Sequence, residues 1–146
     1  MCIRDRHVCI HTNAGGGRGC EVYTFSGSQN QLKYAKPIYE EVAALTLSSD
    51  RGLKTANFAE LRDTNAAAVY CECEFHDSAD TARWIVENTD AIGRAIARGI
   101  CAGGGISFAE GNAPDVSGEL PKSDTPRDPV PLTLNLLGEG LSLIHI

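Results

Sequence analysis

Two cysteines and two glutamates alternate within an apolar run, "AAAVYCECEFHD", at residues 66–77. Side chains on a β-strand point alternately to opposite faces, so Cys71 and Cys73 would share one face and Glu72 and Glu74 the other. Charged residues are rarely placed on a core strand without a reason. This spacing is therefore compatible with three functions: a metal site, a redox pair of cysteines, or a catalytic carboxylate.

Glu72 is the strongest candidate for chemistry in this run. A carboxylate near the carboxyl end of a core strand can act as a general base if burial raises its pKa towards neutrality. A salt bridge with Arg51 or Arg62 would explain the same residue without any catalysis. The local pattern leaves both alternatives open.

His11 is the second candidate. It ends an apolar stretch and is followed by Thr12, Asn13 and a glycine run, "AGGGRG", a place where α/β proteins often bind ligands. A single histidine there can equally be a hydrogen-bonded core residue. The glycine run fits neither common phosphate-loop pattern and favours a flexible rim to a cleft.

The cysteines give a weak signal for metal or disulfides. The chain has six, and without Cys2 an odd number remains, with C-x-C as the only close spacing. Zinc sites favour two to four residues between paired cysteines, and disulfide frameworks use even numbers. We predict that the cysteines are small buried packing residues.

Composition excludes several classes of function. The formal net charge is -6 and no basic cluster is present, which argues against nucleic acid as a partner. No apolar run approaches the roughly 20 residues of a membrane span. We therefore expect neither nucleic-acid binding nor a membrane span.

The periodicity predicts alternating strands and helices. A capping box of Ser28 and Gln31 would open the first helix, and Pro37 within it predicts a kink or a late start. This alternation predicts an α/β fold with a mixed, largely parallel sheet flanked by helices. The expected strands are 7–11, 20–25 and 68–75, and the expected helices are 28–45, one beginning at Ala79, and 89–103.

The first six and last six residues of the chain do not look like part of the natural protein sequence. "MCIRDR" and "LSLIHI" can be encoded by one short DNA element read on opposite strands, so we expect residues 1–6 and 141–146 to derive from a sequencing adapter. We predict that the globular part covers 7–105. A linker rich in proline and glycine follows at 106–140, and we expect a reading frame cut on both sides.

Several segments occur in the order found in one family. The chain resembles the zinc-dependent N-acetylmuramoyl-L-alanine amidases of cell division, sporulation and phage endolysins, over residues 7–102. The segments that carry the resemblance are "CIHTNA" (9–14), "GCEVYTF" (19–25), "DRGLKTANFAELRDT" (50–64), "AAVYCECEFHDSAD" (67–80) and "IGRAIARGI" (92–100).

The resemblance implies roles for the two candidates. His11 matches a zinc-binding histidine, with Zn²⁺ as cofactor, and Glu72 matches the catalytic glutamate; the substrate-binding residues are unknown. Glu74 replaces the family's usual glycine, and we expect its charge to raise the pKa of Glu72. The family's other two zinc ligands lie upstream of the His11 motif, so this fragment of the catalytic domain would be inactive.

The implied function is hydrolysis of the peptidoglycan amide between N-acetylmuramic acid and L-alanine. Zinc would activate the water and Glu72 would be the general base. We expect a monomer in the cell wall or outside the cell, or a phage endolysin delivered to the wall. Two alternatives stay open: a zinc exopeptidase, for which Arg62 could bind a free carboxylate, and a non-catalytic cell-wall-binding module.

Overall fold

The structure is a computed structural model that describes residues 6–46 and 50–111. Its elements follow one another in the order β1 (Arg6–Asn13), β2 (Glu21–Thr24), α1 (Gln29–Ala43), β3 (Leu53–Thr55), α2 (Ala59–Arg62), β4 (Ala67–Phe75), α3 (Ala79–Glu87) and α4 (Thr89–Gly104). The predicted strands and helices are all present. The short elements β3 and α2 were not predicted.

The four strands form one open, mixed sheet in the order β1-β4-β2-β3. β1 pairs with β4 in parallel, β2 pairs with β3 in parallel, and β2 pairs with β4 in antiparallel orientation. The predicted fold class, a largely parallel mixed sheet flanked by helices, is confirmed. β4 lies between β1 and β2, which places the run with Glu72 at the centre of the sheet.

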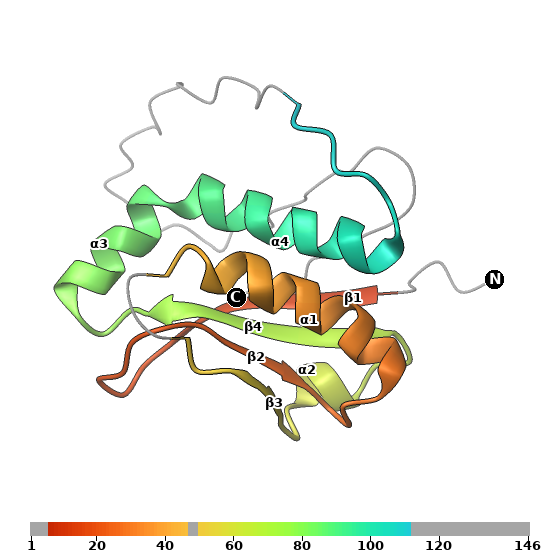
Figure 1. The fold of residues 1–146 in the computed structure, drawn as a ribbon. Helices are drawn as coiled ribbons and strands as arrows, with labels where there is room; N and C mark the ends of the chain where they lie inside the picture. The colour runs from red at the N-terminus through yellow and green to blue at the C-terminus, as the bar shows by residue number, and fades with distance from the viewer. Residues whose placement is uncertain (1–5, 47–49, 112–146) are drawn as a thin grey trace, which may run out of the picture.

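Helices α1 and α4 lie side by side over one face of the sheet (Figure 1). Apolar side chains of β1, β2 and β4 point to this face and form the main core with the two helices. Cys20, Cys71 and Cys73 belong to this core as free thiols, and the Sγ atoms of Cys71 and Cys73 are 3.8 Å apart. The interpretation as buried packing residues is confirmed for these three cysteines, whereas Cys9 and Cys101 are only partly buried.

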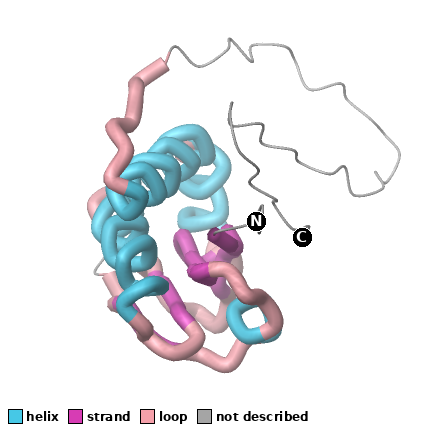
Figure 2. The backbone as a smooth tube through the Cα atoms, turned by 90° about the vertical axis from the view of Figure 1, so that its right-hand side faces the viewer, coloured by secondary structure: helices cyan, strands magenta, loops and turns pink. Residues whose placement is uncertain are grey.

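The opposite face of the sheet has a smaller cover. Figure 2 shows the short helix α2 on the other side of the strands from the long helices. Its buried Leu61 packs against Ala68 and Tyr70 of β4. The remaining part of this face carries the polar residues of the sheet, because side chains alternate along each strand.

The predicted capping box of α1 is wrong. Ser28 is the N-cap residue, but its side chain makes no capping hydrogen bond. The Oε1 atom of Gln31 instead accepts hydrogen bonds at 3.2 Å from the backbone N–H and the hydroxyl of Ser26. The glutamine therefore stabilises the turn before the helix, and Pro37 lies inside the helix without ending it.

Two glycines of α4 allow close contact with α1. A Cβ atom at Gly99 would lie 2.5 Å from the Cα atom of Ile38, and one at Gly103 would lie 2.7 Å from the carbonyl oxygen of Lys33. Real Cβ atoms do not come this close to backbone atoms. The absence of a side chain at these positions therefore sets the distance between the two helices that cover the core.

Gly99→Ala is expected to lower the free energy of unfolding of the full-length protein by about 1–3 kcal/mol, because the new methyl group must push the helices apart. Gly93→Ala is the matched control on the same helix: a Cβ there meets no atom within 4 Å. It should raise stability by up to about 1 kcal/mol through helix propensity. Urea denaturation of both variants measures the difference, and equal shifts would contradict the close packing.

The predicted domain boundaries remain predictions. Helix α4 ends at Gly104, and Gly105 follows in a left-handed conformation with φ 68°, close to the expected end of the globular part. Most of the predicted linker 106–140 and the predicted adapter residues 141–146 lie outside the described residues, while Arg6 already belongs to β1. None of the helices in the described part is long and apolar enough to cross a membrane.

Candidate functional site

The two candidate residues meet on the sheet face that α1 and α4 leave uncovered. His11 on β1 and Glu72 on β4 are direct partners in the parallel strand register. The Nδ1 atom of His11 lies 3.5 Å from Oε2 of Glu72. Glu72 is only 9% exposed, whereas the imidazole is partly open to solvent. The structure thus brings together the two residues that the sequence singled out, from two strands that are far apart in the chain.

A backbone contact determines which nitrogen of His11 carries the proton. Nδ1 lies 3.1 Å from the carbonyl oxygen of Thr12, and a carbonyl can only accept, so Nδ1 is the donor. Nε2 is then the nitrogen with the free lone pair in the neutral ring. The ring also contacts Tyr70, with 5.4 Å between centroids. Metal-binding histidines commonly have this arrangement, in which one ring nitrogen donates to a carbonyl and the other keeps a free lone pair.

Burial raises the pKa of Glu72 above its usual value. The neighbouring His11 works in the opposite direction and lowers this pKa, while the charge of Glu21 raises it further. A carboxyl group with a raised pKa both accepts and returns a proton more readily near neutral pH. The environment of Glu72 therefore suits proton transfer.

The salt-bridge alternative for Glu72 is wrong. Arg51 pairs with Glu21 on β2. Arg62 forms an exposed pair with Asp63, with 2.7 Å between Nε and Oδ1. Both guanidinium groups are thus bound to other carboxylates, and Glu72 has His11 as its neighbour instead.

Glu74 has a structural contact rather than the predicted electrostatic role. Its fully buried Oε1 accepts hydrogen bonds from the backbone N–H of Gly19 at 2.5 Å and of Phe75 at 3.0 Å. The acidic neighbour that raises the pKa of Glu72 is Glu21, across the β2–β4 pair. The expectation that Glu74 does so is therefore corrected: its carboxylate holds the end of the glycine run.

The glycine run, predicted as a flexible rim, makes hydrogen bonds at several points. The N–H groups of Gly15 and Gly16 both donate to Oδ2 of Asp77 at 2.6 Å. Arg18 pairs with Asp80 at the start of α3. The loop that follows His11 is thereby fastened to the loop that follows Glu72, and together they border the site.

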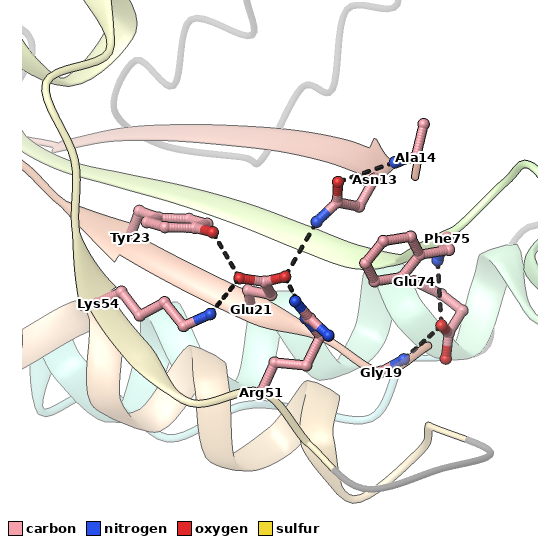
Figure 3. A network of polar contacts seen from close by, with 9 residues as sticks. All are labelled: Asn13, Ala14, Gly19, Glu21, Tyr23, Arg51, Lys54, Glu74 and Phe75. Carbon is pink, nitrogen blue, oxygen red and sulfur yellow. Dashed lines mark hydrogen bonds and ion pairs between the residues drawn. The ribbon is translucent and has the colours of Figure 1, made fainter. Parts of the chain in front are cut away.

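Glu21 is the buried charge that the sequence analysis missed. It is 2% exposed, and its carboxylate is surrounded by four donors (Figure 3). Tyr23 and Lys54 donate to Oε2 at 2.5 Å each, Asn13 donates to Oε1 at 3.0 Å, and Arg51 pairs with Oε1. A glutamate between Cys20 and Val22 on an apolar strand was the available signal, and it is the same signal that pointed to Glu72.

Acid should weaken the fold through Glu21. Burial alone would raise the pKa of this carboxyl, but the hydrogen bonds from Lys54, Tyr23 and Arg51 outweigh burial and lower it to about 2. A pKa lower in the folded than in the unfolded state adds stability above the unfolded value near 4.5. The difference corresponds to about 3 kcal/mol at most, reduced by solvent at the partly exposed Arg51 and Lys54.

This contribution should disappear as the pH falls from about 4.5 to about 2. Urea denaturation at a series of pH values measures the loss. Glu21→Gln is the control, because an amide has no proton to gain; its stability should be lower at neutral pH and depend less on pH in this window. An identical pH profile for both proteins would contradict the assignment.

The described residues do not contain a complete set of ligands for a zinc ion. His11 presents Nε2 in the form that binds metals. Within residues 6–46 and 50–111, however, no group of three or more His, Cys, Asp or Glu side chains is arranged to hold a metal ion. Catalytic zinc sites use three protein ligands. These residues alone therefore do not form a zinc centre.

Comparison with known proteins assigns the chain to a family. Residues 4–102 match the family described as N-acetylmuramoyl-L-alanine amidase, and the chain belongs to this family. It is 38% identical over 96 residues to N-acetylmuramoyl-L-alanine amidase CwlM of Bacillus licheniformis. It is 34% identical over 96 residues to the sporulation-specific N-acetylmuramoyl-L-alanine amidase of Bacillus subtilis (strain 168). Each match covers 65% of this chain and 37% of the relative.

Solved structures share the fold. The catalytic domain of the amidase CwlV from Bacillus (Paenibacillus) polymyxa var. colistinus is similar with a TM-score of 0.62 and 24% identity, over 70% of this chain and 59% of that one. The amidase Ami1 from Mycobacterium smegmatis gives 0.60 and 25%, over 69% and 54%. The chain thus spans little more than a third of the length of the curated relatives it matches.

Proposed function

We propose that this chain is part of the catalytic domain of a peptidoglycan hydrolase that cleaves the amide between N-acetylmuramic acid and L-alanine. The single observation that carries the proposal is the pairing of His11 with the buried Glu72, 3.5 Å apart on adjacent strands. Membership of the amidase family adds the substrate class. The proposed site of action is the bacterial cell wall. The enzyme would act there either as a protein of the bacterium itself or as a phage endolysin.

Glu72 is the general base of the proposed reaction. Its carboxylate accepts a proton from the attacking water and then returns it to the nitrogen of the departing L-alanine. An amine is a poor leaving group unless it is protonated, so the same residue serves both steps. The raised pKa of Glu72 favours the second step, because the carboxyl group must hold the proton for part of the cycle.

His11 is the proposed ligand of a zinc cofactor through Nε2. A bound zinc ion would supply Lewis acidity, which activates water and polarises a carbonyl group. Further ligands would have to complete its coordination, because the described residues hold no group of three or more side chains placed to bind a metal ion. The carbonyl of Thr12 fixes the proton of His11 on Nδ1 and thereby keeps Nε2 available.

The two alternatives gain no support from the geometry. For an exopeptidase, Arg62 would have to bind a terminal carboxylate, but its guanidinium already binds Asp63 and Asn57. For a non-catalytic binding module, a buried carboxylate beside a histidine would be an unexplained cost to stability.

Product analysis with the full-length protein tests the function. Purified muropeptides treated with enzyme and zinc should yield peptides with a free L-alanine amino group and intact glycan. Release of amino acids from the carboxyl end of the stem peptide would identify an exopeptidase. Binding to cell walls without any product would identify a binding module.

A further inference from the structure

The carboxylate of Glu21 links the strands around the candidate site. Glu21 on β2 lies directly across from Glu72 on β4 in antiparallel register. It accepts a hydrogen bond at 3.0 Å from Asn13, which lies on β1 two residues beyond His11. Lys54 on β3 donates to it at 2.5 Å. One buried side chain thus joins β1, β2 and β3 on the face that carries the site.

The end of β1 is irregular, and the contacts of Asn13 add to its pairing with β4 there. The register between β1 and β4 shifts between His11 and Asn13. Beyond this point the carbonyl of Asn13 accepts from the N–H of His76 at 2.9 Å, and its side-chain oxygen accepts from the N–H of Ala14 at 2.8 Å. The amide nitrogen of Asn13 donates to Glu21. Backbone pairing with β4 and side-chain hydrogen bonds therefore hold this strand end together.

Glu21 is itself held firmly. Arg51, Lys54 and the hydroxyl of Tyr23 all bind its carboxylate, and the guanidinium of Arg51 also stacks over Phe75, 5.1 Å from the ring centroid (Figure 3). A buried ionic cluster is a weak device for stability, since apolar residues of similar volume often stabilise as well or better. Its directional hydrogen bonds are better suited to fixing a geometry.

We propose that Glu21 is a positioning residue of the site: through Asn13 it fixes the strand end that carries His11 relative to Glu72. The inference rests on the proposed function, because it assigns a further residue to the same reaction. Glu21 is not a catalytic residue, since its carboxylate is fully occupied by side chains of the protein. Its loss should therefore change the geometry of the site rather than remove a reacting group.

Three variants of the full-length protein test this role. Glu21→Gln removes the negative charge and replaces one carboxylate oxygen with an NH₂ group that cannot accept, so Asn13 must compete with the other donors for a single amide oxygen. The double variant Glu21→Gln/Asn13→Asp restores a hydrogen bond of reversed polarity and the negative charge beside Arg51 and Lys54. The introduced aspartate can still accept from the N–H of Ala14. Glu41→Gln is the matched control, because Glu41 binds Arg98 at 2.7 Å between α1 and α4, on the other side of the sheet.

For Glu21→Gln, kcat on a soluble muropeptide should fall about 10- to 100-fold with KM changed less than about threefold, the size seen when a supporting contact of a site is lost. The double variant should recover at least about tenfold of this loss. Glu41→Gln should keep kcat even where its melting temperature falls. Unchanged kcat in Glu21→Gln would overturn the proposal, as would a loss that the double variant does not recover.

The NMR signals of the His11 ring give the same test without turnover. They should shift in Glu21→Gln, return towards the wild-type positions in the double variant, and stay unchanged in Glu41→Gln. Unmoved signals in Glu21→Gln would overturn the positioning role even if the enzyme is an amidase. Failure of the proposed function has a different signature, namely a wild-type protein that releases no L-alanine peptides or a Glu72→Gln variant that stays active.

Discussion

Glu72→Gln in the full-length protein is expected to lower kcat by about two to four orders of magnitude, the usual contribution of a general acid–base residue. Glutamine keeps the shape of the side chain and removes its ability to take up a proton. The fold and the metal content should therefore be retained, and the loss should appear in kcat rather than in binding. Steady-state kinetics on muropeptides, together with metal analysis, measures both.

Glu74→Gln is the matched control for this experiment. Glu74 lies two residues further along the same strand and on the same face, but its Oε1 only accepts hydrogen bonds from backbone N–H groups. An amide oxygen can do the same, so most of the turnover should remain. An active Glu72→Gln variant, or an equal loss in both variants, would end the assignment of Glu72 as the base.

His11→Ala is expected to weaken zinc binding by more than about 100-fold, beyond the effect of losing an outer-shell partner. The alanine removes the Nε2 lone pair and leaves the strand intact. Competition with a chromophoric chelator measures the affinity. His76→Ala is the control: this exposed histidine binds the hydroxyl of Thr12 at 3.0 Å and is not a proposed ligand. Unchanged zinc affinity in His11→Ala would show that the match of His11 to the family's ligand is wrong.

The sequence was most informative where local periodicity determines the structure. The alternation of Cys71 and Cys73 with Glu72 and Glu74 predicted the two faces of β4, and the structure has this arrangement. The end of α4 at its glycines was also predictable, because a glycine adopts the left-handed conformation of Gly105 at little cost.

Partners that are distant in the chain were not predictable. Glu74 accepts a hydrogen bond from Gly19, which lies 55 residues earlier in the chain. Whether it does so depends on the position of that distant loop, which the local sequence around Glu74 does not indicate. The same is true of Gln31, whose side chain turned to Ser26 rather than to the expected N-cap. The short β3 escaped notice because three residues give no periodicity, although its Lys54 binds Glu21.

The two candidate residues could be singled out from the sequence, but their relative geometry could not be predicted. His11 and Glu72 were singled out by their positions at strand ends, yet only the parallel register of β1 and β4 brings them within 3.5 Å. The network around Glu21 was missed because its donors come from three separate segments of the chain. Such a cluster has no local sequence signature.

Hydrolysis in isotopically labelled water tests the central claim most directly. When water cleaves an amide, its oxygen remains on the carbonyl product. The full-length protein acting on a muropeptide should therefore place heavy oxygen in the lactyl carboxylate of N-acetylmuramic acid and none in the released peptide, and Glu72→Gln should place almost none in either. Mass spectrometry of the two products reads this out. Label in a new carboxyl terminus of the stem peptide, or full labelling of the lactyl group by Glu72→Gln, would contradict an amidase that depends on this glutamate.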